Sequence, residues 1–164
     1  SMVGPDNHRM GLPISRLIIG TNVNDILARF FESGAMEIDT VVPTISPSMD
    51  IQVSSNFERL LFDVFDRDAR LVTQSMAAFR EGGTLSVDAG KMSALGELFA
   101  AGRLDDDGTL KAIADTYKDT GEMLDPHSVI GVAIGQAQRK DLSIPLVSLA
   151  TAHPAKFPDA VEQA

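Results

Sequence analysis

Apolar residues recur at helical spacing over much of the middle of the chain. The clearest stretch has apolar residues at positions i, i+3, i+4, i+7 and i+8, the period of an amphipathic helix. These positions are Phe57, Leu60, Leu61, Val64 and Phe65. Similar spacing predicts a helix ending at Gly82, a shorter one around Leu95, and one ending at Gly121. Asp125 followed by Pro126 predicts a further helix, since Asp is a good N-cap and Pro suits the first helical position.

Shorter apolar runs predict three strands. Residues 16–20 contain a short apolar run, Leu-Ile-Ile, and are followed by a turn and a helix, for which Asn24 is the expected N-cap and Gly34 the expected end. Residues 39–42 form a second candidate strand, and residues 144–150 form the last, which we expect to be buried. A strand–turn–helix unit of this kind is the building block of a parallel sheet.

The order of these elements predicts an α/β fold with a partial parallel sheet of few strands and a large helical insertion. We expect residues 1–8 to be an irregular leader, with the first two of artificial origin. Residues 9–164 are expected to form one domain portion, with the helical insertion at about 57–120. Three strands make a thin sheet, so further strands are expected from sequence outside this chain.

Composition excludes several classes of function. The 164 residues carry a net charge of −9, which disfavours nucleic acid and anionic membranes as partners, because both require clustered Lys and Arg. The absence of cysteine excludes disulfides, thiolate metal sites and cysteine nucleophiles. No apolar run reaches the length of a membrane span and no secretory leader is evident, so a cytoplasmic location is expected.

Three polar side chains directly follow the last predicted strand: Thr151, His153 and Lys156. Ligands of open α/β sheets bind beyond the carboxyl ends of the strands, which makes this segment a candidate site. The Thr151 hydroxyl could bond a ligand's ring nitrogen, or could instead cap its own backbone turn. His153 and Lys156 could contact an anionic ligand, or they could be bonded locally and solvated.

Other polar clusters have simpler explanations. Asp125, His127 and Ser128 suggest a metal site with His153 or a catalytic triad, but Asp125 is required as a helix cap and hydroxyls in a first turn commonly bond the backbone. No serine lies in a Gly-x-Ser-x-Gly elbow. We therefore predict no metal site. A further polar cluster, which caps a helix or offers an anion site at its amino-terminal end, consists of Ser54, Ser55, Asn56 and Arg59.

Five blocks of the chain resemble, in order, the threonine synthases of bacterial and fungal type. They are Arg9–Ile14, Leu17–Leu27, Val41–Leu61, Asp125–Gly131 and the closing motif Leu149–Val161. The resemblance implies the large domain of a fold-type-II enzyme that depends on pyridoxal phosphate (PLP). It implies that the full enzyme converts O-phosphohomoserine and water to threonine and phosphate. It also implies that the Thr151 hydroxyl faces the pyridine nitrogen of the cofactor.

The same resemblance implies two motifs that this chain does not show, a Schiff-base lysine and a Gly-Asn-Phe-Gly-Asp-like loop for the cofactor phosphate. We therefore expect the chain to be the carboxyl-terminal part of such an enzyme, to bind PLP weakly and to be inactive alone. Its expected partner is the missing amino-terminal part, and the face left bare is expected to promote self-association. The alternative is a non-catalytic helical interaction module, in which the closing motif is structural.

Overall fold

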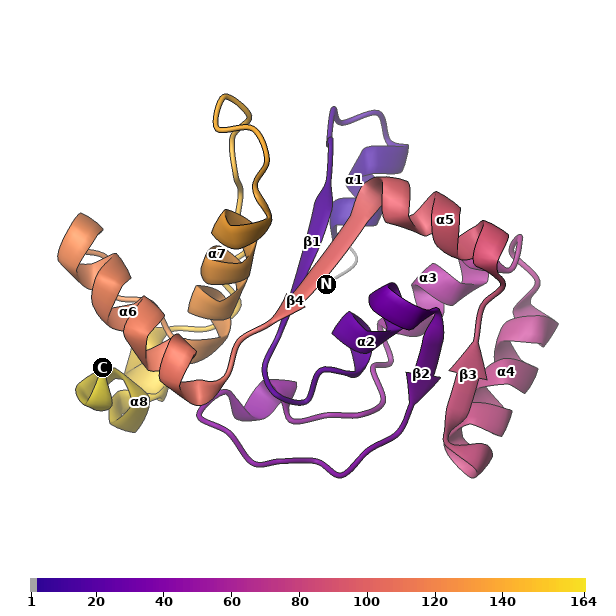
Figure 1. The fold of residues 1–164 in the computed structure, drawn as a ribbon, viewed down its shortest axis with the longest axis horizontal. Helices are drawn as coiled ribbons and strands as arrows, with labels where there is room; N and C mark the ends of the chain where they lie inside the picture. The colour runs from indigo at the N-terminus through magenta and orange to yellow at the C-terminus, as the bar shows by residue number, and fades with distance from the viewer. Residues whose placement is uncertain (1–2) are drawn as a thin grey trace.

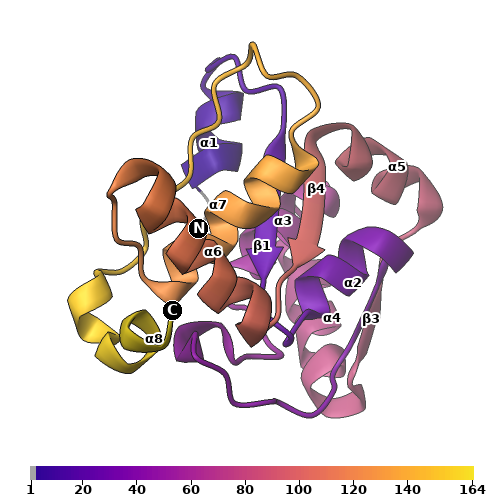
Figure 2. The same ribbon diagram turned by 60° about the vertical axis from the view of Figure 1, so that its left-hand side comes forward.

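The computed structural model describes residues 3–164, and a pair of parallel strands lies at the centre of this range (Figure 1). Strand β1 (Leu17–Thr21) pairs with β4 (Phe99–Arg103). Helix α7 (Pro126–Gln138) packs across both strands (Figure 2). Its close approach requires glycines in the strands, because a Cβ at Gly20 would lie 3.0 Å from Ile130 and one at Gly102 would lie 3.0 Å from Ile134.

A second, antiparallel pair joins β2 (Ala35–Glu37) to β3 (Thr84–Ser86). Helices α2 (Ile26–Ser33), α3 (Phe57–Val64) and α4 (Ala69–Gly82) surround the main apolar core next to this pair. Burial of this apolar surface stabilises the domain. The buried core residues are Ile26, Phe30, Met36, Phe57, Leu60, Leu61, Val72, Met76, Phe79, Leu85 and Phe99.

The remaining helices lie around this framework. They are α1 (Val3–Arg9), α5 (Ala89–Leu98), α6 (Asp106–Thr120) and α8 (Pro158–Gln163). Two single 3-10 turns, η1 (Pro47–Met49) and η2 (Pro154–Lys156), complete the structure. Helix α6 packs against α7, and α8 packs against α6. Among the described residues, no helix is both long and apolar enough to cross a membrane.

Helices predicted from local signals are confirmed. Gly34 ends α2 in the left-handed conformation, with φ of 77°, and Gly83 ends α4 in the same way, with φ of 75°. Asp105 caps α6 and Asp125 caps α7 through their carboxylates. At these four positions the signal depends on residues a few positions apart, which is why the sequence alone reveals it.

The strand predicted at residues 39–42 is wrong, and the explanation involves Asn24. The Asn24 side chain accepts a hydrogen bond from the Val42 N–H at 2.8 Å and donates one to the Val42 carbonyl at 2.8 Å. One amide side chain therefore satisfies the backbone groups that a neighbouring strand would bind. The expectation that Asn24 caps α2 is also wrong, because Asp25 occupies the N-cap position, without a side-chain capping bond.

The buried final strand predicted at residues 144–150 is wrong as well. These residues have no strand partner among those the structure describes, and Val147 is 80% exposed. The Arg139 guanidinium binds the carbonyls of Leu142 and Ile144 at the start of the segment. An apolar run becomes a strand only when another strand is available to bind its backbone.

Two further predictions differ from the structure in detail. Strands β3 and β4 both lie inside the range 57–120 that was expected to be helical. The β4 sequence, Phe-Ala-Ala-Gly-Arg, lacks β-branched residues, so its strand character was not evident. Residues 3–9 form helix α1 where an irregular leader was expected, while Ser1 and Met2 lie outside the described residues. The α/β fold class itself, with a small parallel sheet, is confirmed.

Candidate functional site

The carboxyl ends of the parallel strands mark the edge at which α/β proteins bind ligands. Strand β1 ends at Thr21, and β4 ends at Arg103 directly opposite it. Asn22 and Asn24 follow β1 and are 1% and 4% exposed. The start of α7 lies near the same end, because His127 binds the backbone of Ser48, two residues from Asp50, and Asp50 binds Asn22. The candidate site is built from the segment after β1, the start of α7 and the loops that contact both.

Asp50 is the centre of a polar network beside the end of β1. Its Oδ1 accepts hydrogen bonds from Asn22 Nδ2 at 2.8 Å and from Asn24 Nδ2 at 3.0 Å. Thr44 donates its hydroxyl to Oδ1 at 2.6 Å and its backbone N–H to Oδ2 at 2.9 Å. The buried Ser46 hydroxyl lies 3.0 Å from Asn22 Nδ2. Because unpaired buried polar groups are costly, this network fixes the loop against β1.

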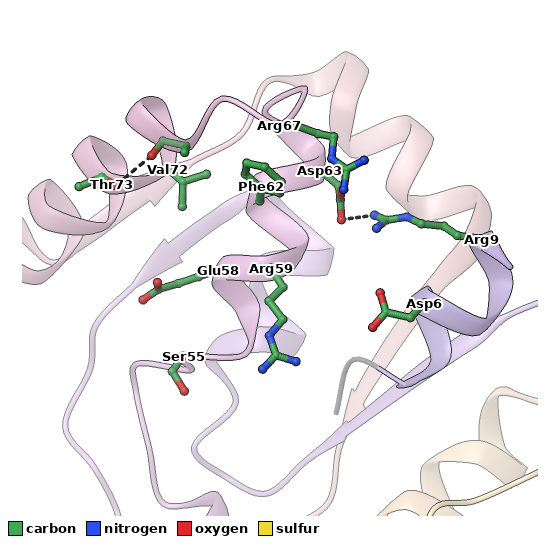
Figure 3. Close-up of a pocket in the computed structure, with 11 residues that line it drawn as sticks. Asp6, Arg9, Ser55, Glu58, Arg59, Phe62, Asp63, Arg67, Val72 and Thr73 are labelled. Carbon is green, nitrogen blue, oxygen red and sulfur yellow. Dashed lines mark hydrogen bonds and ion pairs between the residues drawn. The ribbon is translucent and has the colours of Figure 1, made fainter.

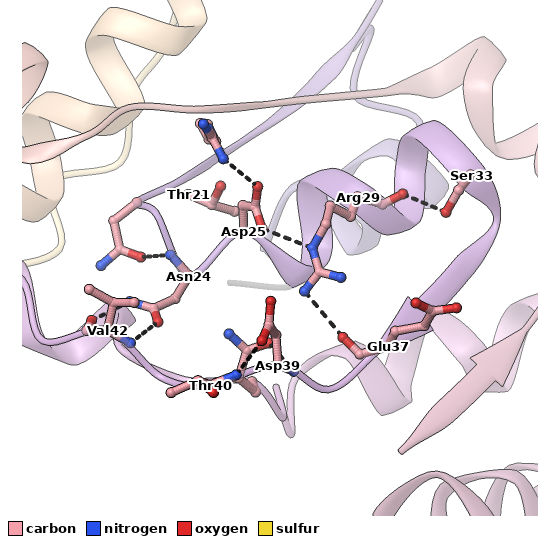
Figure 4. A network of polar contacts seen from close by, with 12 residues as sticks. Thr21, Asn24, Asp25, Arg29, Ser33, Glu37, Asp39, Thr40 and Val42 are labelled. Carbon is pink, nitrogen blue, oxygen red and sulfur yellow. Dashed lines mark hydrogen bonds and ion pairs between the residues drawn. The ribbon is translucent and has the colours of Figure 1, made fainter. Parts of the chain in front are cut away.

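Asp25 connects the start of α2 to the end of β4 (Figure 4). Its Oδ1 accepts from Arg29 Nε at 2.9 Å, and its Oδ2 accepts from Arg103 Nη1 at 3.1 Å. Arg29 also donates to the Glu37 carbonyl at 3.1 Å. Both carboxylate oxygens of Asp25 and the guanidinium of Arg29 are therefore engaged in bonds that join elements of the fold. This pair has a structural role rather than a catalytic one.

A second buried cluster forms at the start of α7. Asp125 Oδ1 accepts from the N–H groups of His127 at 2.9 Å and Ser128 at 3.3 Å, and lies 2.9 Å from His127 Nδ1. The His127 Nε2 accepts the Ser48 N–H at 3.2 Å, so the hydrogen-bond pattern assigns the tautomer with its proton on Nδ1. The ring also packs on Phe157, with centroids 4.6 Å apart.

Asp125 is ionised because its partners outweigh its burial. Burial by itself raises the pKa of Asp125, but the Ser128 hydroxyl, the His127 ring and the backbone N–H groups of both residues lower it below the usual value. Its other oxygen, Oδ2, is buried without a hydrogen-bond partner among the described residues. The cluster is thus a helix cap that also holds two distant segments.

The structure places the predicted site residues in one loop beside this cluster. Thr151 donates its backbone N–H to the Ser128 hydroxyl at 3.0 Å, and its side chain is exposed. His153 accepts the Ala155 N–H on Nδ1 at 3.2 Å and is exposed, as is Lys156. The local hydrogen bond considered for His153 is therefore present, and it involves Nδ1. No group of three or more His, Asp or Glu side chains placed to bind a metal occurs among the described residues.

A separate hollow lies between α1, α3 and α4 (Figure 3). Helix α3 is the amphipathic helix that the sequence predicted most clearly. It has a volume of about 450 Å³. Arg9 forms an ion pair with Asp63, and the Arg67 guanidinium lies 5.5 Å from the centroid of the Phe62 ring. The expected cap at Asn56 makes no side-chain capping bond. Charges of both signs line this open hollow, so it offers no selective anion site.

The chain is similar in sequence to threonine synthases. A family model described as "Threonine synthase, C-terminal" matches residues 128–164. Threonine synthase of Pseudomonas aeruginosa is 49% identical over 155 residues, covering 94% of this chain and 33% of that protein. Threonine synthase of Corynebacterium glutamicum is 40% identical over 162 residues, covering 95% and 34% respectively.

The solved structures agree with the sequences. The crystal structure of PLP-bound threonine synthase from Brucella melitensis matches with a TM-score of 0.91 and 50% identity, over 97% of this chain and 34% of that one. Threonine synthase from yeast matches with a TM-score of 0.89 and 38% identity, over 97% and 35%. Along nearly its whole length the chain is similar to threonine synthases. It spans about a third of the length of the relatives that it matches.

The threonine synthase match begins at Ser128, the residue that binds the Thr151 backbone. The family resemblance predicted from five sequence blocks is thereby confirmed, and relatives that are enzymes favour it over a helical interaction module. Sequence reasoning did not assign the roles of Asp50, Ser48 or Phe157 in this candidate site. Their partners lie far away in the sequence, so no local spacing indicated them.

Proposed function

We propose that this chain forms the carboxyl-terminal part of a PLP-dependent threonine synthase that acts in threonine biosynthesis in the cytoplasm. The reaction converts O-phosphohomoserine and water to threonine and phosphate. The observation that carries the proposal is the position of Thr151. It lies in the matched segment, its backbone is bound to the start of α7, and its side chain is exposed.

The residues present fit one part of a PLP site. A neutral hydroxyl at Thr151 donates a hydrogen bond to a pyridine nitrogen without the positive charge that an aspartate would stabilise there. The bond from its N–H to Ser128 holds the backbone in place, and this leaves the hydroxyl to turn toward a ligand. When bound, PLP supplies the electron sink for the chemistry at the substrate carbons.

His153 and Lys156 are the proposed contacts for the anionic substrate. Both are exposed and lie within five residues of Thr151. The Lys156 ammonium is a compact positive charge, suited to a phosphate or carboxylate. His153 keeps Nδ1 as an acceptor for the Ala155 N–H, so Nε2 is the nitrogen that would face the substrate.

The Schiff-base lysine and the loop for the cofactor phosphate are proposed to come from the other part of the enzyme, which is the proposed partner of this chain. The chain alone is therefore expected to release no phosphate from O-phosphohomoserine. Incubation of the purified chain with PLP and borohydride should likewise give no stoichiometric lysine adduct. Phosphate release by the chain alone would contradict this part of the proposal.

The role of Thr151 is tested by Thr151→Val and Thr151→Ser in the complete enzyme. Loss of one hydrogen bond to the ring should weaken PLP binding about tenfold in Thr151→Val. Thr151→Ser keeps the hydroxyl and should bind PLP nearly as well as the parent. PLP affinity is measured by titration of cofactor fluorescence. Equal affinity of Thr151→Val and the parent would refute the assigned contact.

A further inference from the structure

We propose that Ser128 and Asp125 are positioning residues that set the direction of the Thr151 hydroxyl toward the cofactor ring. This inference rests on the proposed function of Thr151. Neither residue is assigned a contact with PLP or substrate. Their effect would pass through the backbone of Thr151 and would therefore appear as a change in cofactor binding.

The first step is the contact between Ser128 and Thr151. The two residues are 23 positions apart, and the Ser128 hydroxyl accepts the Thr151 N–H at 3.0 Å. Ser128 is 4% exposed, so water cannot readily replace it as the acceptor. Thr151 otherwise belongs to a loop without helix or strand. This hydrogen bond is consequently a specific restraint on the backbone from which the Thr151 side chain projects.

The second step is the orientation of the Ser128 hydroxyl by Asp125. A serine hydroxyl has one hydrogen to donate and lone pairs with which to accept. One lone pair receives the Thr151 N–H, so the hydrogen must point elsewhere. Asp125 is 1% exposed, and its buried Oδ2 has no partner that meets hydrogen-bond geometry among the described residues. Burial raises the pKa of the Asp125 carboxyl, but the Ser128 side chain lowers it, which is the effect of a hydroxyl that donates toward a carboxylate. The hydrogen therefore faces Asp125 and a lone pair faces Thr151.

The same Asp125 carboxylate also holds the loop that follows β1. Asp125 Oδ1 lies 2.9 Å from His127 Nδ1, whose ring accepts the Ser48 N–H at 3.2 Å. Ser48 belongs to the turn next to Asp50, which is bonded to the end of β1. A single buried carboxylate therefore holds both the Thr151 loop and the loop after β1 in register. A cap needed only for α7 would require neither contact.

The test uses the complete enzyme with PLP and three variants. Ser128→Ala removes the acceptor, and Thr151→Val removes the proposed ring contact. Thr109→Val is the matched control, because Thr109 is also buried near the start of a helix but bonds only the Asp105 carbonyl, at 2.7 Å. Ser128→Ala should weaken PLP binding several-fold, toward the tenfold limit of one hydrogen bond, whereas Thr109→Val should not weaken it.

The double variant Ser128→Ala/Thr151→Val separates positioning from general damage. If Ser128 acts through the Thr151 hydroxyl, Ser128→Ala should add no further loss of PLP affinity once Thr151 is Val. Amide hydrogen exchange of the peptide around Thr151 should also be faster in PLP-free Ser128→Ala than in PLP-free Thr109→Val. This second readout does not depend on cofactor binding.

The possible results distinguish the inference from the proposed function. If Thr151→Val weakens PLP binding but Ser128→Ala does not, the positioning role is overturned and the ring contact stands. If losses in the double variant simply add, Ser128 does not act through Thr151 and the inference is overturned. If Thr151→Val binds PLP normally, the ring contact and the positioning role both fail, whatever the exchange rates are.

Discussion

Two regions of this molecule reverse the usual distribution of polar and apolar residues. Beside the end of β1, the side chains of Asn22, Asn24 and Ser46 are buried. Between residues 142 and 149, by contrast, Leu142 and Val147 are each 80% exposed. The comparison shows that burial here follows the availability of partners rather than side-chain polarity alone. Polar groups are buried where this chain supplies their hydrogen bonds, and apolar groups stay exposed where it supplies no strand to pair with.

The two regions also differ in how their backbones are bound. In the polar region, side chains such as Asn24 and Asp50 bind backbone groups of Val42 and Thr44. The segment 142–149, by contrast, forms no ladder of hydrogen bonds with β1. A hollow of about 240 Å³ lies between Ile144 and Leu146 on one side and Ile18 of β1 on the other. A single polar substitution should therefore lower the free energy of unfolding strongly in the polar region beside β1. It should change that free energy little in the segment 142–149. Asp50→Ala and Val147→Ser test this difference, and Asp125→Asn tests the buried cluster at the start of α7.

The largest effect is expected from Asp50→Ala. This change removes the acceptor for two buried amides and for the Thr44 backbone and hydroxyl. Leaving such donors unpaired should lower the free energy of unfolding by about 3 kcal/mol. Asp39→Ala is the control, because among the described residues the exposed Asp39 carboxylate bonds only the adjacent Thr40 N–H, and its loss should cost at most about 0.5 kcal/mol. Equal losses in urea unfolding would show that Asp50 is not central to the network.

A smaller and pH-dependent effect is expected from Asp125→Asn. Asparagine retains an N-cap oxygen but not the charge, so the variant should be less stable by about 1–2 kcal/mol at neutral pH. The folded-state pKa of Asp125 is lowered, so its stabilisation is present above the unfolded pKa and is lost as pH falls through the folded pKa.

The stabilities of the parent and Asp125→Asn should therefore converge below the usual pKa of 3.8. They should remain separated at every pH above it, and urea unfolding from pH 2.5 to pH 7 measures both curves. A difference that stayed constant down to pH 2.5 would mean that the carboxylate charge contributes nothing to the cluster.

Sequence reasoning succeeded where structure depends on neighbouring residues. Gly34 and Asp125 end and begin their helices as predicted, because caps involve residues a few positions apart. It failed for Asn24, whose partner Val42 lies 18 residues away, and for the strand at 144–150. Thr151 was predicted as a site residue from a strand that the structure does not form and from the family resemblance, whereas its bond to Ser128 depends on how α7 meets the closing loop.

The smallest effect on folding is expected from Val147→Ser in the exposed segment. Because the Val147 side chain is 80% exposed, little apolar contact is lost, and the free energy of unfolding should change by no more than about 0.5 kcal/mol. Self-association should respond more strongly, since exposed apolar residues at 142, 144, 147 and 149 form the surface on which copies of the chain would meet. Sedimentation velocity over a range of concentrations should show weaker association for Val147→Ser than for Ser143→Ala, a control in the same exposed loop. A loss of stability above about 1.5 kcal/mol would instead mean that Val147 is packed in solution, and the contrast between the two regions would then fail.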